Sequence, residues 1–264
     1  MNLMRLQFIG VGAAFAFDNF QSNMVLEVDG KRLLIDAGGD ARHALRAQNL
    51  SHRSLDAVYV SHLHGDHVHG MEWLALATYF DPEFKHGDGN KKKLQLFLSN
   101  KLKRDIWEHS MRAGCATLQG VRNTLETYFD VKGVGRNGKF EFAGTSFRLV
   151  QTVHYVDDRE IVPSYGLFWT APNGQVVFLT TDTQFAPASI KTFINKADVV
   201  FHDCEVARFP SGIHAHYSEL KTLPAEMKRK MWLYHYQDGE KPDCTADGFA
   251  GWVTQGQVFD FSAK

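Results

Sequence analysis

The chain has 264 residues, of which 44% are hydrophobic and 22% are charged. These shares are close to the globular average, so they exclude a disordered chain or a fibrous repeat. Lys and Arg total 29 against 30 Asp and Glu, and the resulting net charge of -1 excludes a broad basic surface for gripping nucleic acid.

No uncharged apolar run approaches the ~20 residues that a membrane span needs. The opening MNLMRLQFIG also lacks the longer apolar stretch of a secretory signal. Cys115, Cys204 and Cys244 are odd in number and share no close spacing, which argues against a disulfide framework. Apolar runs continue along the whole chain without a gap. We therefore expect one domain spanning residues 1–264, located in the cytoplasm and without a membrane partner.

Short apolar or alternating runs bounded by turn residues predict the strands. They occupy residues 5–11, 24–28, 32–36, 57–60, 140–142, 147–153, 165–171 and 175–179. Asp29-Gly30, Asn137-Gly138 and Asn173-Gly174 each lie between two such runs and predict tight hairpins, so the sheets should be partly antiparallel. Helical spacing appears at 71–79, 101–111 and 220–231, and the polar stretch 82–93 predicts a loop.

The strongest chemical signal is the stretch Ser61-His62-Leu63-His64-Gly65-Asp66-His67, which follows a predicted strand. On an extended segment residues i and i+2 point the same way, so His62 and His64 can hold one cation. Asp66 and His67 lie at the turn into a helix and can hold a second one. Zinc, manganese and iron all accept such nitrogen and oxygen ligands.

Three further candidate ligands each lie at the end of an apolar run: His154, Asp182 and His235. Ligands at strand ends can converge on one rim of a sheet. A site for two ions needs a ligand that touches both, and a carboxylate with two oxygens can do this, so we assign that role to Asp182. An Asx turn is the alternative for Asp182, and His154 or His235 alone could be an ordinary core or surface histidine.

The order His62-x-His64-x-Asp66-His67, then His154, Asp182 and His235, resembles the metallo-β-lactamase superfamily, and within it the ribonuclease Z-like phosphodiesterase branch. Residues 6–12 and 33–38 are also similar to the first strands of that branch. The resemblance implies an α/β (α+β) fold, a four-layer αββα sandwich with two divalent ions at one edge. Zn²⁺ is the favoured ion and Mn²⁺ the alternative. One ion would be held by the group His62, His64, His154 and Asp182, and the other by the group Asp66, His67, Asp182 and His235.

The same branch has a buttressing histidine and acidic residue that correspond to His202 and Asp203, although ribonuclease Z usually has glutamate at the second position. The segment 213–218 resembles the branch's histidine segment, whose histidine protonates the leaving oxygen. We align His214 there, with His216 as the alternative. Asp66 would orient the attacking water, whose pKa coordination lowers toward ~7.

The branch also bears on the substrate. Ribonuclease Z commonly inserts a long substrate arm between its third histidine and its bridging aspartate, but only residues 155–181 separate His154 from Asp182 here. This favours a small phosphodiester, above all a 3′,5′-cyclic nucleotide that is hydrolysed to the nucleoside monophosphate. Similar small-substrate enzymes include phage anti-Pycsar phosphodiesterases, and their pockets are often completed across a homodimer. Arg159 could pair with phosphate and Tyr165 could stack on a base.

Two alternatives share the predicted metal ligands. A transfer RNA 3′ endonuclease of the ribonuclease Z type would use the same catalytic residues, although the near-zero charge argues against stable binding of nucleic acid. Another hydrolase of the superfamily could act on a thioester or a lactam. The His202-Asp203 pair and His214 favour the phosphodiesterase.

Overall fold

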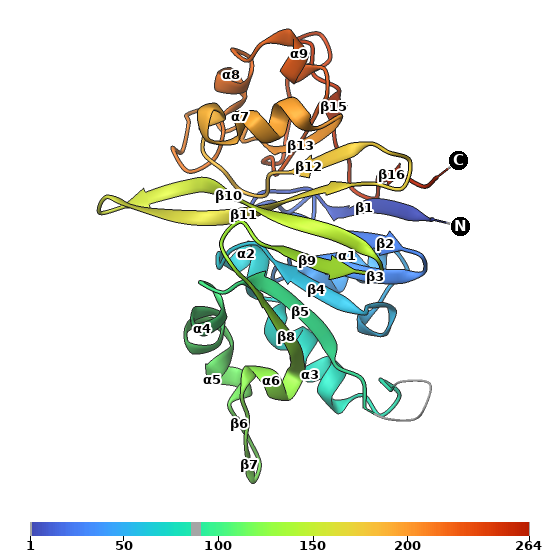
Figure 1. Ribbon diagram of the computed structural model, residues 1–264. Coiled ribbons are helices and arrows are strands. Elements are labelled where there is room, and N and C mark those ends of the chain that lie inside the picture. Colours follow the sequence, from blue (N-terminus) through green and yellow to red (C-terminus); the bar gives the residue numbers. More distant parts are fainter. Residues whose placement is uncertain (1, 86–90, 264) are drawn as a thin grey trace.

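The centre of the fold is a pair of seven-stranded sheets (Figure 1). The computed structural model describes residues 2–85 and 91–263. The first sheet contains, in spatial order, β16 (Val258–Asp260), β1 (Met4–Gly10), β2 (Asn23–Val28), β3 (Lys31–Ile35), β4 (Ala57–Val60), β5 (Leu94–Ser99) and β8 (Phe129–Val134). The second contains β15 (Gly251–Trp252), β14 (Met231–Tyr234), β13 (Val199–Asp203), β12 (Val176–Leu179), β11 (Glu160–Thr170), β10 (Thr145–Asp157) and β9 (Lys139–Phe142). A separate hairpin pairs β6 (Thr117–Leu118) with β7 (Val121–Arg122).

Helices cover the outer face of each sheet, so the expected αββα order is confirmed (Figure 1). Those beside the first sheet are α1 (Ala41–Ala47), the 3₁₀ turn η1 (His52–Ser54), α2 (Gly65–Val68), α3 (Met71–Phe80), α4 (Lys103–Asp105), the π-helical η2 (Ile106–Met111), α5 (Arg112–Cys115) and α6 (Leu125–Tyr128). Those beside the second sheet are α7 (Pro187–Lys196), α8 (Tyr217–Leu220) and α9 (Ala225–Lys228). None of the described helices combines the length and the apolar character that crossing a membrane requires.

Aromatic side chains join the two sheets. The ring of Tyr59 in the first sheet stacks on Phe140 in the second at 5.7 Å, and Phe8 contacts Phe201 at 5.0 Å. All four side chains are buried. Buried aromatic rings of this size contribute strongly to core stability. This packing fixes the relative position of the two sheets, and therefore of the loops at their edges.

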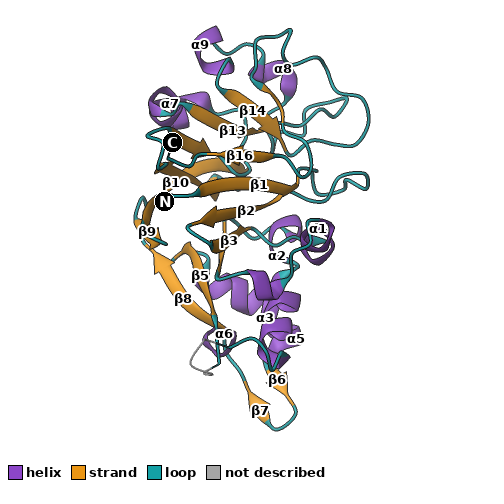
Figure 2. Cartoon of the chain, turned by 90° about the vertical axis from the view of Figure 1, so that its right-hand side faces the viewer, coloured by secondary structure: helices purple, strands orange, loops and turns teal. Residues whose placement is uncertain are grey.

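The parallel strands bring the candidate ligands to one edge of the molecule. In the first sheet β3, β4, β5 and β8 are parallel, and in the second β12 to β15 are parallel. The carboxyl ends of parallel strands meet at one edge of a sheet. Strands β4, β12 and β14 each end just before a predicted ligand. Figure 2 shows the long loops that leave the strands on this edge.

Every predicted strand overlaps an observed one, but two other predictions were wrong. Residues 220–231 do not form one helix, because Pro224, which has no N–H to donate, separates α8 from α9, and strand β14 begins at Met231. Asn137-Gly138 does not close a hairpin either. It connects β8 of the first sheet with β9 of the second, so its left-handed Asn137 (φ 57°) turns the chain between the sheets.

The predicted helix at 101–111 is the continuous helical segment made of α4, η2 and α5. The predicted polar loop at 82–93 is described only in part, since residues 86–90 lie outside the described residues. On either side of that gap, Lys85 and Lys91 form an antiparallel bridge.

Candidate metal centre

The histidine motif lies where β4 ends and α2 begins. Ser61 and His62 are buried directly after Val60, and His64 is the residue before the first turn of α2. Asp66 and His67 are buried within that turn. Gly38 makes this arrangement possible, because a Cβ there would collide with the backbone oxygen of Asp66. The first sheet thus supplies four of the seven predicted ligands.

The second sheet supplies the other three. His154 lies in β10, Asp182 follows β12, and His235 follows β14. Thr181 (φ 54°) and His235 (φ 66°) adopt left-handed backbone conformations. Such conformations cost about 1–3 kcal/mol each for residues other than glycine and are concentrated at functional sites. Thr181 turns the chain just before Asp182, and His235 itself occupies such a turn. Each sharp turn therefore fixes the position of a predicted ligand.

The seven side chains form the two groups predicted from the sequence. In each group the possible ligand atoms lie within 4.8 Å of one another. The two groups share Asp182, whose Oδ2 lies 3.6 Å from His62 Nε2 and 3.8 Å from His154 Nε2 in the first group. In the second group the same oxygen lies 3.2 Å from His67 Nε2 and 3.4 Å from His235 Nε2.

The donor atoms in these groups fit divalent cations. His62 Nε2, His67 Nε2 and both carboxylate oxygens of Asp182 are buried and have no hydrogen-bond partner among the described residues. A buried polar atom without a partner is costly, and a cation would supply one. Imidazole nitrogens with carboxylate oxygens suit zinc or manganese. The assignment of each residue as a metal ligand stays a prediction.

The electrostatics of the first group also suit a cation. Burial opposes ionisation of Asp182, but His235 and His67 hold its pKa well below the usual range. Burial lowers the pKa of His62 well below its ordinary value and that of His154 to about 4. The carboxylate is therefore charged, and these two imidazoles are neutral with a lone pair to donate. Both are the forms that bind metals. In the second group burial opposes the charged imidazoles, but the carboxylates of Asp182 and Asp66 raise the pKa of His67 and His235, so these two must lose a proton when they bind an ion.

Further contacts that the sequence analysis did not identify orient the ligand rings. Asp36 Oδ2 lies 2.8 Å from His67 Nδ1 and accepts a 2.7 Å hydrogen bond from the hydroxyl of Ser61. His154 Nδ1 donates to the backbone oxygen of Ile213. Such partners fix the orientation of a ligating imidazole. Asp36 ends a predicted strand, so the rule that selected Asp182 could also have selected it.

His214 lies beside the two groups. Its Nδ1 is 2.8 Å from Asp203 Oδ2 and 3.8 Å from Asp182 Oδ2, and its ring stacks on His235 at 4.6 Å. Burial opposes its charged form, but the Asp203 carboxylate and the hydrogen bond to it raise the pKa of His214 to about 10. His214 is therefore protonated at neutral pH and can act as a general acid.

The alternative acid, His216, has a structural role. Its Nδ1 accepts a hydrogen bond from the backbone N–H of Ser218 at the start of α8, and its Nε2 donates to the backbone oxygen of Ala207. Both ring nitrogens are thus engaged outside the metal centre. The buried His202 contacts the predicted centre indirectly, because its Nδ1 donates to the backbone oxygen of Asp203.

The two predicted substrate residues lie elsewhere. Tyr165 is only 1% exposed in the core between the sheets, so the expectation that it stacks on a base was wrong. Alternating side chains of a strand face opposite sides, and Tyr165 faces inward. Arg159 is exposed at the tip of the β10–β11 hairpin, which projects from the body in Figure 1. Its role as a phosphate ligand stays a prediction.

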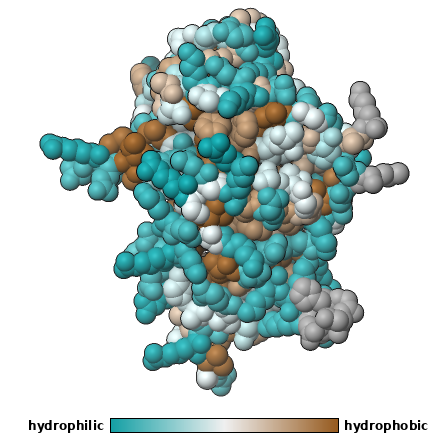
Figure 3. Space-filling view, in the orientation of Figure 1, coloured by the Kyte–Doolittle hydropathy of each residue, from teal (hydrophilic) through white to brown (hydrophobic). Residues whose placement is uncertain are grey.

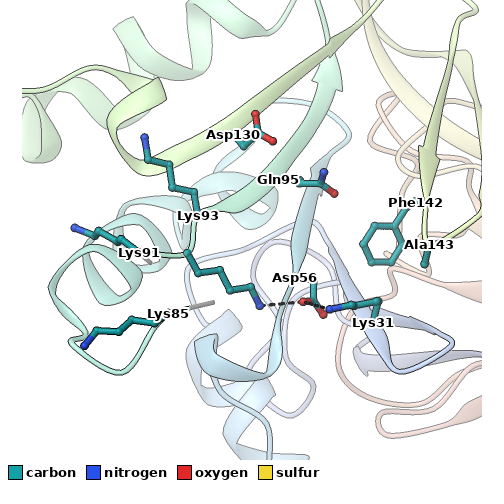
Figure 4. A pocket seen from close by; sticks show the side chains of 10 residues that line it. Lys31, Asp56, Lys85, Lys91, Lys93, Gln95, Asp130, Phe142 and Ala143 are labelled. Carbon is teal, nitrogen blue, oxygen red and sulfur yellow. Dashed lines mark hydrogen bonds and ion pairs between the residues drawn. The ribbon is translucent and has the colours of Figure 1, made fainter. Parts of the chain in front are cut away.

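A separate cleft of about 690 Å³ is rich in lysine (Figure 4). Lys31 and Lys92 both pair with Asp56 there, at 3.3 and 2.9 Å. Lys91 lies over the ring of Tyr79. None of the predicted metal ligands lines this cleft. Because these three lysines already have partners, we assign no chemistry to the cleft.

The two covered sheets and the edge cluster of histidines and aspartates define a metallo-β-lactamase fold protein with a candidate centre for two metal ions. Among solved structures, a diphosphatase from the PhnP family superposes with a TM-score of 0.75 at 16% identity, over 98% of each chain. The metallo-β-lactamase fold protein YhfI from Bacillus subtilis superposes with a TM-score of 0.73 at 17% identity, over 98% of this chain and 100% of that one. At these identities the likeness shows the fold.

The sequence comparison defines the family. The family described as Anti-Pycsar protein Apyc1 matches residues 4–259, and the chain therefore belongs to the Apyc1 family. The Anti-Pycsar protein Apyc1 of Paenibacillus harenae is 36% identical over 239 residues, which are 89% of this chain and 90% of that protein. The resemblance stated from the sequence is thus confirmed.

Proposed function

We propose that this protein is a dinuclear metal-dependent phosphodiesterase that hydrolyses a 3′,5′-cyclic nucleotide to the nucleoside monophosphate. The observation that carries the proposal is the shared position of Asp182 between two ligand groups, with the protonated His214 beside it. Two divalent cations, when bound, would make a water acidic enough to attack near neutral pH and would offset the negative charge of the phosphate.

The residues of the chain have separate roles in this reaction. Asp66 Oδ2 lies 3.2 Å from His67 Nε2 and 3.3 Å from His235 Nε2, so it is held in place to orient the attacking water. His214 Nδ1 donates a hydrogen bond to Asp203, and Nε2 can donate its proton to the departing ribose oxygen. An alkoxide leaves poorly without a proton, so an acid at this position suits the departure of a ribose oxygen from phosphorus.

The segment between His154 and Asp182 supports a small substrate. It contains the end of β10, strand β11, strand β12 and their turns. No part of it forms an arm beyond the β10–β11 hairpin, and all of it lies within the described residues. A transfer RNA would need additional contact surface. The transfer RNA endonuclease and the thioester or lactam hydrolase are therefore secondary candidates.

We also propose that the protein acts as a homodimer. Six exposed apolar side chains lie on three segments of the chain: Phe15 and Phe17, Phe209 and Ile213 in two loops, and Val156 and Ile161 near the tip of the β10–β11 hairpin. Figure 3 shows apolar surface on the projecting β10–β11 hairpin behind its hydrophilic tip. Clustered exposed apolar surface is typical of an interaction site.

The free, buried cysteines support the predicted cytoplasmic location.

The test is an assay of the purified protein with added Zn²⁺ or Mn²⁺. The substrates are the 3′,5′-cyclic mononucleotides, a transfer RNA precursor and a chromogenic lactam. We expect hydrolysis of a cyclic nucleotide, abolished in His62→Ala and retained in His216→Ala. Cleavage of the precursor or the lactam without cleavage of any cyclic nucleotide would refute the proposal. Sedimentation of the same protein tests the dimer, and a monomer at assay concentration would contradict it.

A further inference from the structure

A cavity of about 390 Å³ opens beside the first ligand group. His62 and His64 line both the cavity and the predicted ion site. A nucleotide joins its base to its phosphate through a single ribose, so the base must occupy a space that adjoins the phosphate site. This cavity meets that condition on the side of the first group.

The walls of the cavity are apolar. Leu63, Leu102, Ile161, Val162 and Pro163 contribute to them. Tyr155 also lines the cavity, and its ring is parallel to that of His64 within 10°, at 5.5 Å. This contact holds the tyrosine ring in a fixed plane. Apolar walls with one oriented aromatic ring suit a flat heterocycle better than a second phosphate or a sugar.

Among the described residues, two charged side chains that can reach a ligand's edge line the cavity, Lys101 just before α4 and Asp105 within it. Their opposite charges cancel, so the cavity does not favour an anionic group. An ammonium donates hydrogen bonds and a carboxylate accepts them. Together they complement a polar edge that carries both an acceptor and a donor, which is the pattern of a nucleobase.

We propose that this cavity binds the nucleobase of the substrate, with Tyr155 as the stacking residue and Lys101 and Asp105 as the residues that recognise the polar edge of the base. This assignment rests on the proposed phosphodiesterase function and adds the residues that determine base specificity.

The first test compares substrates with and without a base. We measure kcat/KM for each 3′,5′-cyclic nucleotide and for methyl p-nitrophenyl phosphate, a diester without a nucleobase. Asp105→Asn and Lys101→Gln should each lower the ratio of the two by about tenfold for at least one base and change the ranking of the bases. Tyr155→Leu should lower the ratio by about tenfold for all bases.

Matched controls come from the same helical segment. Lys103 pairs with Glu126 and Glu108 pairs with Arg112, and neither lines the cavity. Lys103→Gln and Glu108→Gln should leave the ratio unchanged. If the ratio and the ranking in the three cavity variants equal those of the controls, the cavity does not bind the base.

A binding measurement separates failure of this assignment from failure of the proposed function. Protein loaded with Zn²⁺ is titrated with nucleoside 5′-monophosphates, and the methyl resonances are followed by NMR. Leu63, Leu102 and Ile161 should shift, whereas Val258 on the distant strand β16 should not. If no cyclic nucleotide is hydrolysed but these methyls shift, the proposed function is wrong and the assignment of the cavity as a nucleobase site is retained. Unshifted cavity methyls would refute the cavity assignment whatever the activity.

Discussion

Replacement of Asp203 by asparagine should introduce a loss of activity between pH 6 and pH 8 that the parent protein does not show. The Asp203 carboxylate lies 2.8 Å from His214 Nδ1 and raises the pKa of that histidine to about 10. The protonated form thus persists through neutral pH and is lost only as the pH rises through about 10. Without the carboxylate charge, the pKa of His214 should fall to about 6.5, the ordinary value of histidine, or below.

The size of the effect follows from the two pKa values. At pH 8 an acid with a pKa of about 10 is about 99% protonated, and one with a pKa of about 6.5 is about 3% protonated. Asp203→Asn should therefore lower kcat/KM by about 30-fold at pH 8, and by less than about twofold at pH 6. The amide has nearly the same size and shape as the carboxylate it replaces, so packing should change little.

The assay is a profile of kcat/KM from pH 5.5 to pH 10 for the parent protein and the variant, with metal content measured on the same samples. Asp203 belongs to neither of the two predicted ligand groups, but it forms a third cluster with Asp182, His214 and His235, and its Oδ1 lies 3.4 Å from His235 Nδ1, so the metal content separates a change in the pKa of His214 from the loss of an ion. A loss of equal size at pH 6 and pH 8, with full metal content, would show that His214 does not supply the proton.

Three further outcomes are expected. Asp182→Ala should lower the content of both ions by elemental analysis, and loss of one ion alone would contradict its shared position. His214→Ala should keep the metal but lower turnover by ~10²-fold, whereas His216→Ala should lower only the melting temperature, by removing a cap worth about 1 kcal/mol. Gly38→Ala should displace Asp66, cost about 1–3 kcal/mol of stability and lower the metal content. Gly39→Ala is its control, since its Cβ would meet no atom closer than 3.8 Å, and equal effects would refute the reasoning.

The sequence predicted the features that depend on local pattern. The spacing of His62, His64, Asp66 and His67 is local, and so is the position of Asp182 at the end of a strand. The prediction of one helix at 220–231 was wrong because it followed the apolar spacing and disregarded Pro224. The prediction for Tyr165 was wrong because a strand with both faces covered has no alternation of polar and apolar residues, so its sequence does not indicate which side chains face the core. Pairing between distant strands decides such cases, and a single sequence does not display it.

Each ligand group combines side chains from both halves of the chain. His62, His64, Asp66 and His67 come from the first sheet, and His154, Asp182 and His235 come from the second. During synthesis, the amino-terminal half of the chain alone therefore cannot form either complete ligand group. Metal binding by both groups should therefore appear late in synthesis, once His235 has left the ribosome and its strand has docked, and products truncated before His235 should lack the second ion.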